Sequence, residues 1–123
     1  MAGISQTYTL SIKDDAGRLV TTDTHSVTGD ASEEFSLVVP GSGNVTLPLT
    51  VDVSAVVAFY VVCDKAVTML ENTSDLSVVL AAGVPYWWYT GKGDNPFTVD
   101  ITSLKFTKAD ATDALVKGAF LTT

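Results

Sequence analysis

The sequence predicts an all-β fold, a single-domain β-sandwich over residues 1–123 that is jelly-roll-like, with about eight to ten strands and no substantial helix. Valine and threonine, which favour strands, are abundant along the whole chain. Short segments with apolar residues at every second position recur between turn-forming residues, as expected for successive strands. No segment has a helical period, and residues 108–114 have room for one helical turn at most.

The first half of the chain contains four predicted strands. Tyr8, Leu10 and Ile12 alternate with polar residues, which is typical of a half-buried strand. Pro48 interrupts an otherwise regular alternation, and because proline cannot donate to a ladder, its strand is expected at an edge or to break there. The predicted strands are residues 7–12, 18–28, 35–39 and 45–53, with turns or loops at Asp14–Gly17, Gly29–Ser32 and Pro40–Gly43.

The second half begins with the most apolar segment of the chain. Val56–Cys63 is apolar at almost every position, so it is predicted to be a central strand that is covered on both faces. A glycine-rich loop is expected over residues 91–96. The remaining predicted strands are residues 67–71, 76–81, 86–90, 98–107 and 114–122.

Composition excludes several classes of protein. The chain has 14 acidic and 7 basic residues, a net charge of −7, and the basic residues are scattered, so we expect no nucleic-acid binding. No apolar run reaches the roughly 20 residues of a membrane helix, and the first residues lack the pattern of a secretory signal. We therefore expect a protein made in a cytoplasm, with no membrane partner. Cys63, the only cysteine, is expected to be a buried small hydrophobe.

Catalytic chemistry has little support in the sequence. His25 is the only histidine, and although Asp23 shares its strand face, the chain does not supply the usual four ligands of a structural zinc site. The segment Gly91–Asp94 lacks the full spacing of a phosphate-binding loop, and no helix follows it. We therefore predict that the protein is not an enzyme and needs no cofactor or metal.

Four consecutive aromatic residues, Tyr86, Trp87, Trp88 and Tyr89, are the strongest feature of the chain. Alternation in a strand puts Tyr86 and Trp88 on one face and Trp87 and Tyr89 on the other. Each large aromatic side chain buries roughly 150–250 Å², and a sandwich offers each sheet only one inner face. The second pair is then covered by a neighbouring loop, faces a partner protein or forms a sugar-stacking platform. The predicted interface residues are Tyr86, Trp87, Trp88, Tyr89, Pro96 and Phe97.

Several short segments between residues 52 and 107 form a pattern shared with known proteins. They are Val67–Met69, Asn72–Ser74, Leu80, Ala82–Pro85, Trp88–Gly91, Asn95–Phe97, Asp100–Thr102, Leu104 and Phe106. In these segments the chain resembles a family of small structural proteins from tailed bacteriophages. The doubled Trp87–Trp88 departs from the family pattern, in which one Trp has an aliphatic neighbour.

The resemblance implies a virion structural protein, a capsid cement or head decoration protein. Such a protein would bind the major capsid protein on the outer surface of the head, at junctions between capsid subunits, and stabilise it. The resemblance also implies a homo-oligomer, either a dimer or a trimer. Two alternatives remain: a tail, adaptor or fibre component of the virion, and a carbohydrate-binding β-sandwich for attachment to the host.

Overall fold

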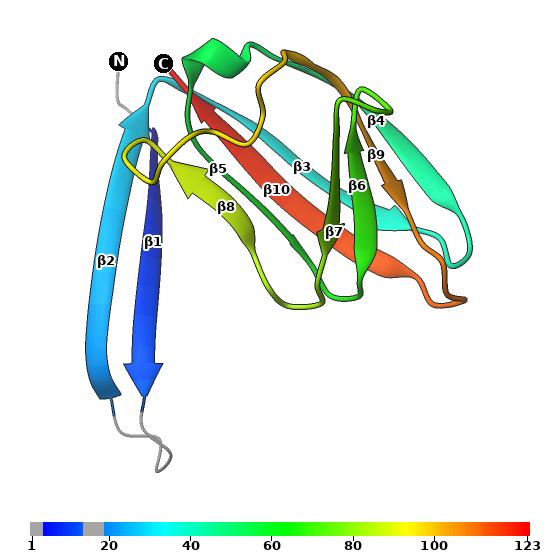
Figure 1. Cartoon of the computed structure of the whole chain (residues 1–123), viewed down its shortest axis with the longest axis horizontal. Coiled ribbons are helices and arrows are strands. Elements are labelled where there is room, and N and C mark those ends of the chain that lie inside the picture. Colours follow the sequence, from blue (N-terminus) through cyan, green and yellow to red (C-terminus); the bar gives the residue numbers. More distant parts are fainter. Residues whose placement is uncertain (1–3, 14–18) are drawn as a thin grey trace.

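The computed structural model describes residues 4–13 and 19–123, which form ten β-strands and one short 3-10 helix (Figure 1). The first five strands are β1 (Ile4–Lys13), β2 (Leu19–Gly29), β3 (Ala31–Val39), β4 (Asn44–Val51) and β5 (Val56–Cys63), with η1 (Val53–Ala55) before β5. The last five are β6 (Val67–Glu71), β7 (Leu76–Leu80), β8 (Tyr86–Tyr89), β9 (Ile101–Thr107) and β10 (Ala114–Thr122). The described residues contain no α-helix, and thus none that is long and apolar enough to cross a membrane.

Strands β3 to β10 form two four-stranded antiparallel sheets, in the orders β3-β10-β5-β8 and β4-β9-β6-β7. Successive strands mostly alternate between the two sheets, so most connections cross from one layer to the other (Figure 1). This strand order is that of a jelly roll, which consists of two interleaved Greek keys. The predicted all-β, jelly-roll-like sandwich is therefore confirmed.

The hydrophobic core lies between these two sheets. On β5, Phe59, Val61 and Cys63 point inward, and inward side chains from β10, β9 and β6 meet them. Three aromatic rings, Phe59, Phe97 and Phe120, pack with centroids 5.0 to 5.4 Å apart at the centre of the core. Both sheets thus bury one face against the other, as the alternating sequence predicts.

Two strand positions follow the sequence closely. β5 lies between β10 and β8, the central position that its continuous apolar run predicts. β4, which contains Pro48, is an edge strand, and its pairing with β9 is irregular between Pro48 and Val51. Proline has no N–H for a second neighbour, so an edge is where it is tolerated.

Some predicted boundaries were wrong. The loop predicted at Gly29–Ser32 is reduced to a bend at Asp30, because β2 runs to Gly29 and β3 starts at Ala31. Strand β9 begins at Ile101, not near residue 98. Just before it, the Asp100 carboxylate accepts a hydrogen bond from the Val53 N–H. The turn predicted at Asp14–Gly17 lies outside the described residues.

Strands β1 and β2 form a separate two-stranded antiparallel sheet, which we call the arm. Its root lies near the end of β10, and the rest of the ribbon extends past the outline of the sandwich (Figure 1). The predicted strands in this region are confirmed. The sequence did not indicate that they would pair with each other outside the two main sheets.

Candidate functional site

Two of the four aromatic side chains of β8 point into the core. Trp88 lies opposite Phe59 on β5 and is buried, and its indole Nε1–H donates a hydrogen bond of 3.1 Å to the Gly93 carbonyl oxygen. Tyr86 packs on Phe59, with ring centroids 5.6 Å apart. Phe97, from the loop after β8, is fully buried between these rings and Phe120. These three aromatics therefore belong to the core.

The other two aromatics of β8 lie on the outer face of the sheet and are half-buried. The rings of Trp87 and Tyr89 stack with centroids 5.5 Å apart and an interplanar angle of 29°. The Lys92 ammonium lies 4.4 Å from the centroid of Trp87 and donates a hydrogen bond to the Trp87 carbonyl oxygen at 3.1 Å. This combination of stacking and cation–π contact fixes the pair on the outside of the sandwich.

The root of the arm forms a partial second layer on this outer face. Leu121 and Ala58 point away from the main core, on β10 and β5, and both are fully buried. Gly29 of β2 lies directly above Leu121, so close that a Cβ at this position would be 2.8 Å from Leu121 Cγ. A shallow groove runs between the arm and the sheet and is lined by Ser5, Gln6, Thr7, Ser32, Glu34, Tyr60 and Ala119. The chain itself thus covers one end of the outer face.

The structure places the predicted interface residues in three locations. Tyr86, Trp88 and Phe97 belong to the core, and only Trp87 and Tyr89 lie on the outer face, while Pro96 is half-buried in the loop after β8. Strand alternation predicted this split. It did not indicate which pair would point inward, because that depends on the register with β5.

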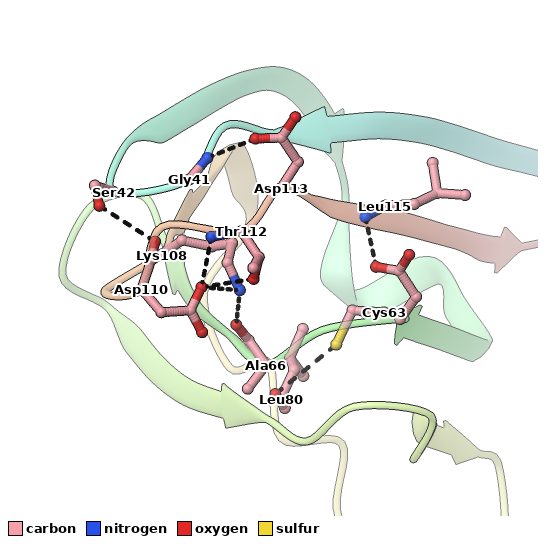
Figure 2. Close-up of polar contacts among 11 residues, drawn as sticks. Gly41, Ser42, Cys63, Ala66, Leu80, Lys108, Asp110, Thr112, Asp113 and Leu115 are labelled. Atoms are coloured by element: carbon pink, nitrogen blue, oxygen red, sulfur yellow. Dashed lines mark hydrogen bonds and ion pairs between the residues drawn. The ribbon is translucent and has the colours of Figure 1, made fainter.

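A network of polar contacts joins the loops at the end of the sandwich opposite the arm (Figure 2). The side chain of Lys108 is fully buried, and its Nζ donates to the Ala66 carbonyl at 3.0 Å and pairs with Asp110 Oδ1 at 3.0 Å. The Asp110 backbone carbonyl accepts a hydrogen bond from the Ser42 N–H, which ties the β9–β10 loop to the β3–β4 loop. Hydrogen bonds from the Thr112 hydroxyl and from Lys108 lower the pKa of Asp110 to about 2.

Two further carboxylates of this network cap backbone N–H groups. Asp113 Oδ1 accepts from the Gly41 N–H at 2.8 Å, and Asp64 Oδ1 accepts from the Leu115 N–H at 2.7 Å (Figure 2). The network joins the β3–β4, β5–β6 and β9–β10 loops to the start of β10 through these hydrogen bonds and one ion pair. We interpret it as structural.

The Cys63 thiol lies at the edge of this network. Its Sγ is 3.8 Å from the Leu80 carbonyl oxygen and 3.6 Å from that of Ala81, within range of weak hydrogen bonds (Figure 2 shows the first of these). Burial raises the pKa of the thiol, which disfavours the reactive thiolate. The prediction that Cys63 is buried is confirmed.

Glu71, at the end of β6, is a buried carboxyl group that sequence reasoning missed. Its side chain is 1% exposed, and its Oε2 has no hydrogen-bond partner within the described residues. Burial raises its pKa to about 7, and the nearby charges of Asp75 and Asp100 contribute to the shift. Burial also raises the pKa of Tyr86, and the Glu71 charge adds to that effect. The sequence does carry a signal for this burial, because Glu71 follows Val67 and Met69 at every second position of β6, on the inward face.

The free energy of unfolding should fall as pH rises because of Glu71. The pKa of Glu71 is about 7 in the folded state against an ordinary value of 4.5, so the folded protein holds this proton more tightly than the unfolded chain. This contribution is complete below pH 4.5 and is lost as pH rises through about 7. Glu71→Gln, which is neutral at every pH, should therefore be more stable than the wild type by about 1–3 kcal/mol at pH 9.

Urea denaturation at pH 5 and pH 9 measures this difference. Glu33→Gln is the matched control, because Glu33 is exposed on β3, and it should keep the pH dependence of the wild type. An equal loss of stability between pH 5 and pH 9 in Glu71→Gln and in the wild type would show that Glu71 is not responsible.

No metal-binding cluster is found in the described part of the chain. No three His, Cys, Asp or Glu side chains there lie close enough together to hold a metal ion. Asp94 and Lys92 sit in an exposed turn after β8, and Lys92 contacts Trp87. The side chains of Asp23 and His25 lie outside what the structure describes, so the interpretation of His25 stays a prediction.

The outer face of the sheet β3-β10-β5-β8, with Trp87, Tyr89 and the root of the arm, is thus the best candidate for a functional surface. No protein-family model matches the chain, and neither does any curated protein or solved structure.

Proposed function

We propose that this chain is a structural protein of a tailed-bacteriophage virion, a capsid cement or decoration protein that binds the outer surface of the head. The observation that carries the proposal is the aromatic pair Trp87 and Tyr89, held on the outer face of a jelly roll beside a projecting arm. Tyr and Trp are enriched where protein surfaces lose water on association. The resemblance of residues 52–107 to small phage structural proteins supports a phage virion as the assembly.

The fold is compatible with this function without determining it. Jelly rolls recur in viral capsid proteins, and they also occur in lectins. A binding protein of this kind acts through surface complementarity and needs neither catalytic groups nor a cofactor. Its partners would be the major capsid protein, at junctions between subunits, and further copies of itself.

Two alternatives make different predictions. A tail, adaptor or fibre component would be present in few copies per particle, whereas a cement protein is present in hundreds, and quantitative gel analysis of virions separates them. The stacked pair Trp87 and Tyr89 also favours a carbohydrate-binding sandwich. Lys92 already occupies a position over the Trp87 ring, which reduces the surface on which a sugar would stack. Quenching of tryptophan fluorescence by glycans would support that alternative.

Trp87→Ala should lower the occupancy of capsids without unfolding the protein. Truncation of an aromatic hot spot typically costs about 2 kcal/mol or more of binding free energy, which is roughly 30-fold in affinity. Co-sedimentation of the purified protein with capsids at increasing concentration measures the loss, and thermal unfolding verifies that the variant is folded at the assay temperature.

The controls separate binding from folding. Val79→Ala changes a side chain that is 76% exposed on the opposite sheet, so it should leave occupancy unchanged. Trp88→Ala removes a core side chain, so we expect it to lower the stability of the fold, in contrast to Trp87→Ala. Wild-type protein that never sediments with particles would reject the proposal.

A further inference from the structure

The arm is a two-stranded ribbon whose strands pair, among the described residues, only with each other. Ten residue pairs connect β1 to β2, from Ile4 with Gly29 to Lys13 with Leu19. An isolated two-stranded hairpin is marginally stable in water, because it lacks a layer against which to bury a face. Most of the ribbon extends past the sandwich, so a covering layer has to come from elsewhere (Figure 1).

The arm is anchored at its root in a fixed direction. The Asp30 N–H donates a hydrogen bond of 2.7 Å to the Thr122 carbonyl oxygen, and Gly29 packs directly on Leu121. Asp30 is the only residue between β2 and β3, so the arm continues almost directly into an edge strand of the sandwich. An element held in this way loses less conformational entropy on binding than a flexible tail does.

The outer face of the sheet is covered at one end and bare at the other. Near the root of the arm, Leu121 is 0% exposed. At the opposite end of the same strand, Leu115 is 37% exposed, and its cross-strand partner Val38 on β3 is 56% exposed. Val62 on β5 adds a third, half-buried apolar side chain to the same face. We call Val38, Val62 and Leu115 the distal patch.

The arm has the sequence pattern needed to cover such a patch. Tyr8, Leu10 and Ile12 occupy every second position of β1, which predicts an apolar row along the β1 side of one ribbon face. Their register partners on β2, His25, Asp23 and Thr21, are polar and form the other side of that face. The arm leaves the sandwich at the far end of β10 from Leu115, so its own distal patch is not in its path (Figure 1). A second copy of the chain offers the same patch without this restriction.

We propose that the arm of one copy lies on the distal patch of a second copy, in a closed homo-oligomer formed by reciprocal exchange of arms. The extended part of β2, Leu19–His25, is about 24 Å long and the ribbon about 10 Å wide, so one face offers roughly 240 Å². Two arms and two patches together bury about 1,000 Å², which is the lower limit for a specific interface. In a two-fold symmetric dimer, each arm covers the distal patch of the other copy, so neither patch stays exposed.

Disulfide trapping between two differently labelled variants tests the contact directly. Asp23→Cys places a thiol on the arm opposite Leu10 in the register, and Ser36→Cys places one on the exposed face of β3, two residues from Val38. Oxidation of an equimolar mixture of the two single variants should give a mixed disulfide of twice 12.9 kDa. The control mixture pairs Asp23→Cys with Ser77→Cys, which is exposed on β7 of the other sheet, and should give at least tenfold less.

Sedimentation velocity supplies a second measurement without new cysteines. The wild type should sediment as an oligomer, and Leu115→Lys should weaken self-association at least tenfold. Val79→Lys, which carries the same substitution on the opposite sheet, should sediment like the wild type. A wild type that stays monomeric at several hundred micromolar, or trapping no stronger than in the control mixture, would overturn the proposal.

These experiments use the isolated protein, so they are independent of the proposed binding to capsids. Protection of the distal patch only when capsids are added would overturn the second-copy occupant in favour of the head surface. Arm exchange in a protein that never binds capsids would leave this inference standing and reject the proposed function.

Discussion

Phe59→Ala is expected to lower the free energy of unfolding by about 4 kcal/mol, the usual range for a buried phenylalanine. The Phe59 ring is fully buried and packs on Phe97, Phe120 and Tyr86 with centroid distances of 5.0, 5.4 and 5.6 Å. Its removal leaves a cavity at the point where the two sheets and the loop after β8 meet. Because neighbouring side chains relax only partly into such a cavity, the lost contacts add to the lost transfer free energy.

Tyr60→Ala provides the matched control for Phe59→Ala. Tyr60 is the next residue of β5, also aromatic, but it points to the outer face and is half-buried beneath the root of the arm. We expect a loss of about 1–2 kcal/mol, less than half of that for Phe59. Urea denaturation of both variants measures the difference, and equal losses would contradict a core that lies between the two sheets.

Lys108→Ala is expected to destabilise the protein by about 3 kcal/mol, the loss typical of breaking a buried polar network. The Lys108 side chain is 0% exposed, whereas that of Asp110 is 64% exposed. Substitution by alanine removes the packed aliphatic stem and leaves the Ala66 carbonyl without its donor. It also removes the side-chain link between the β9–β10 loop and Ala66 in the β5–β6 turn, which Figure 2 shows.

Two companion variants of Lys108→Ala identify the cause. Lys108→Met keeps the volume of the stem, and the exposed Asp110 carboxylate regains water, so the loss should be about half of that in Lys108→Ala. Lys65→Ala removes an exposed lysine from the β5–β6 turn and should have little effect. Thermal and urea unfolding measure all three. Equal stability of Lys108→Ala and Lys65→Ala would show that the network does not hold the loops together.

Strand positions were predictable from the sequence because a half-buried strand and a turn leave local signals. The continuous apolar run Val56–Cys63 predicted the central strand, Pro48 indicated an edge strand, and Pro40–Gly43 predicted a turn. The strand order was not readable, because pairing such as that of β10 with β3 joins residues far apart in the chain. For the same reason the sequence did not show that β1 and β2 leave the sandwich.

The candidate site was predictable only in part. Alternation separated Trp87 from Trp88, and only the register with β5 decided that Trp88 faces the core. Lys108 resembles an exposed loop residue in the sequence, although it follows Leu104 and Phe106 at even spacing on the inward face of β9. Its burial depends on the Ala66 carbonyl, which a different loop supplies. Contacts of this kind are set by tertiary structure and leave no local pattern.

In the function that we propose, the outer face bearing Trp87 and Tyr89 is a surface for assembly on a phage head. An electron-microscopy reconstruction of heads saturated with the protein tests it most directly. We predict density for a two-layered β-domain at junctions between capsid subunits, in hundreds of copies, with the outer face of β8 against the capsid. Saturated heads without such density, or with the domain attached through the opposite sheet, would contradict it.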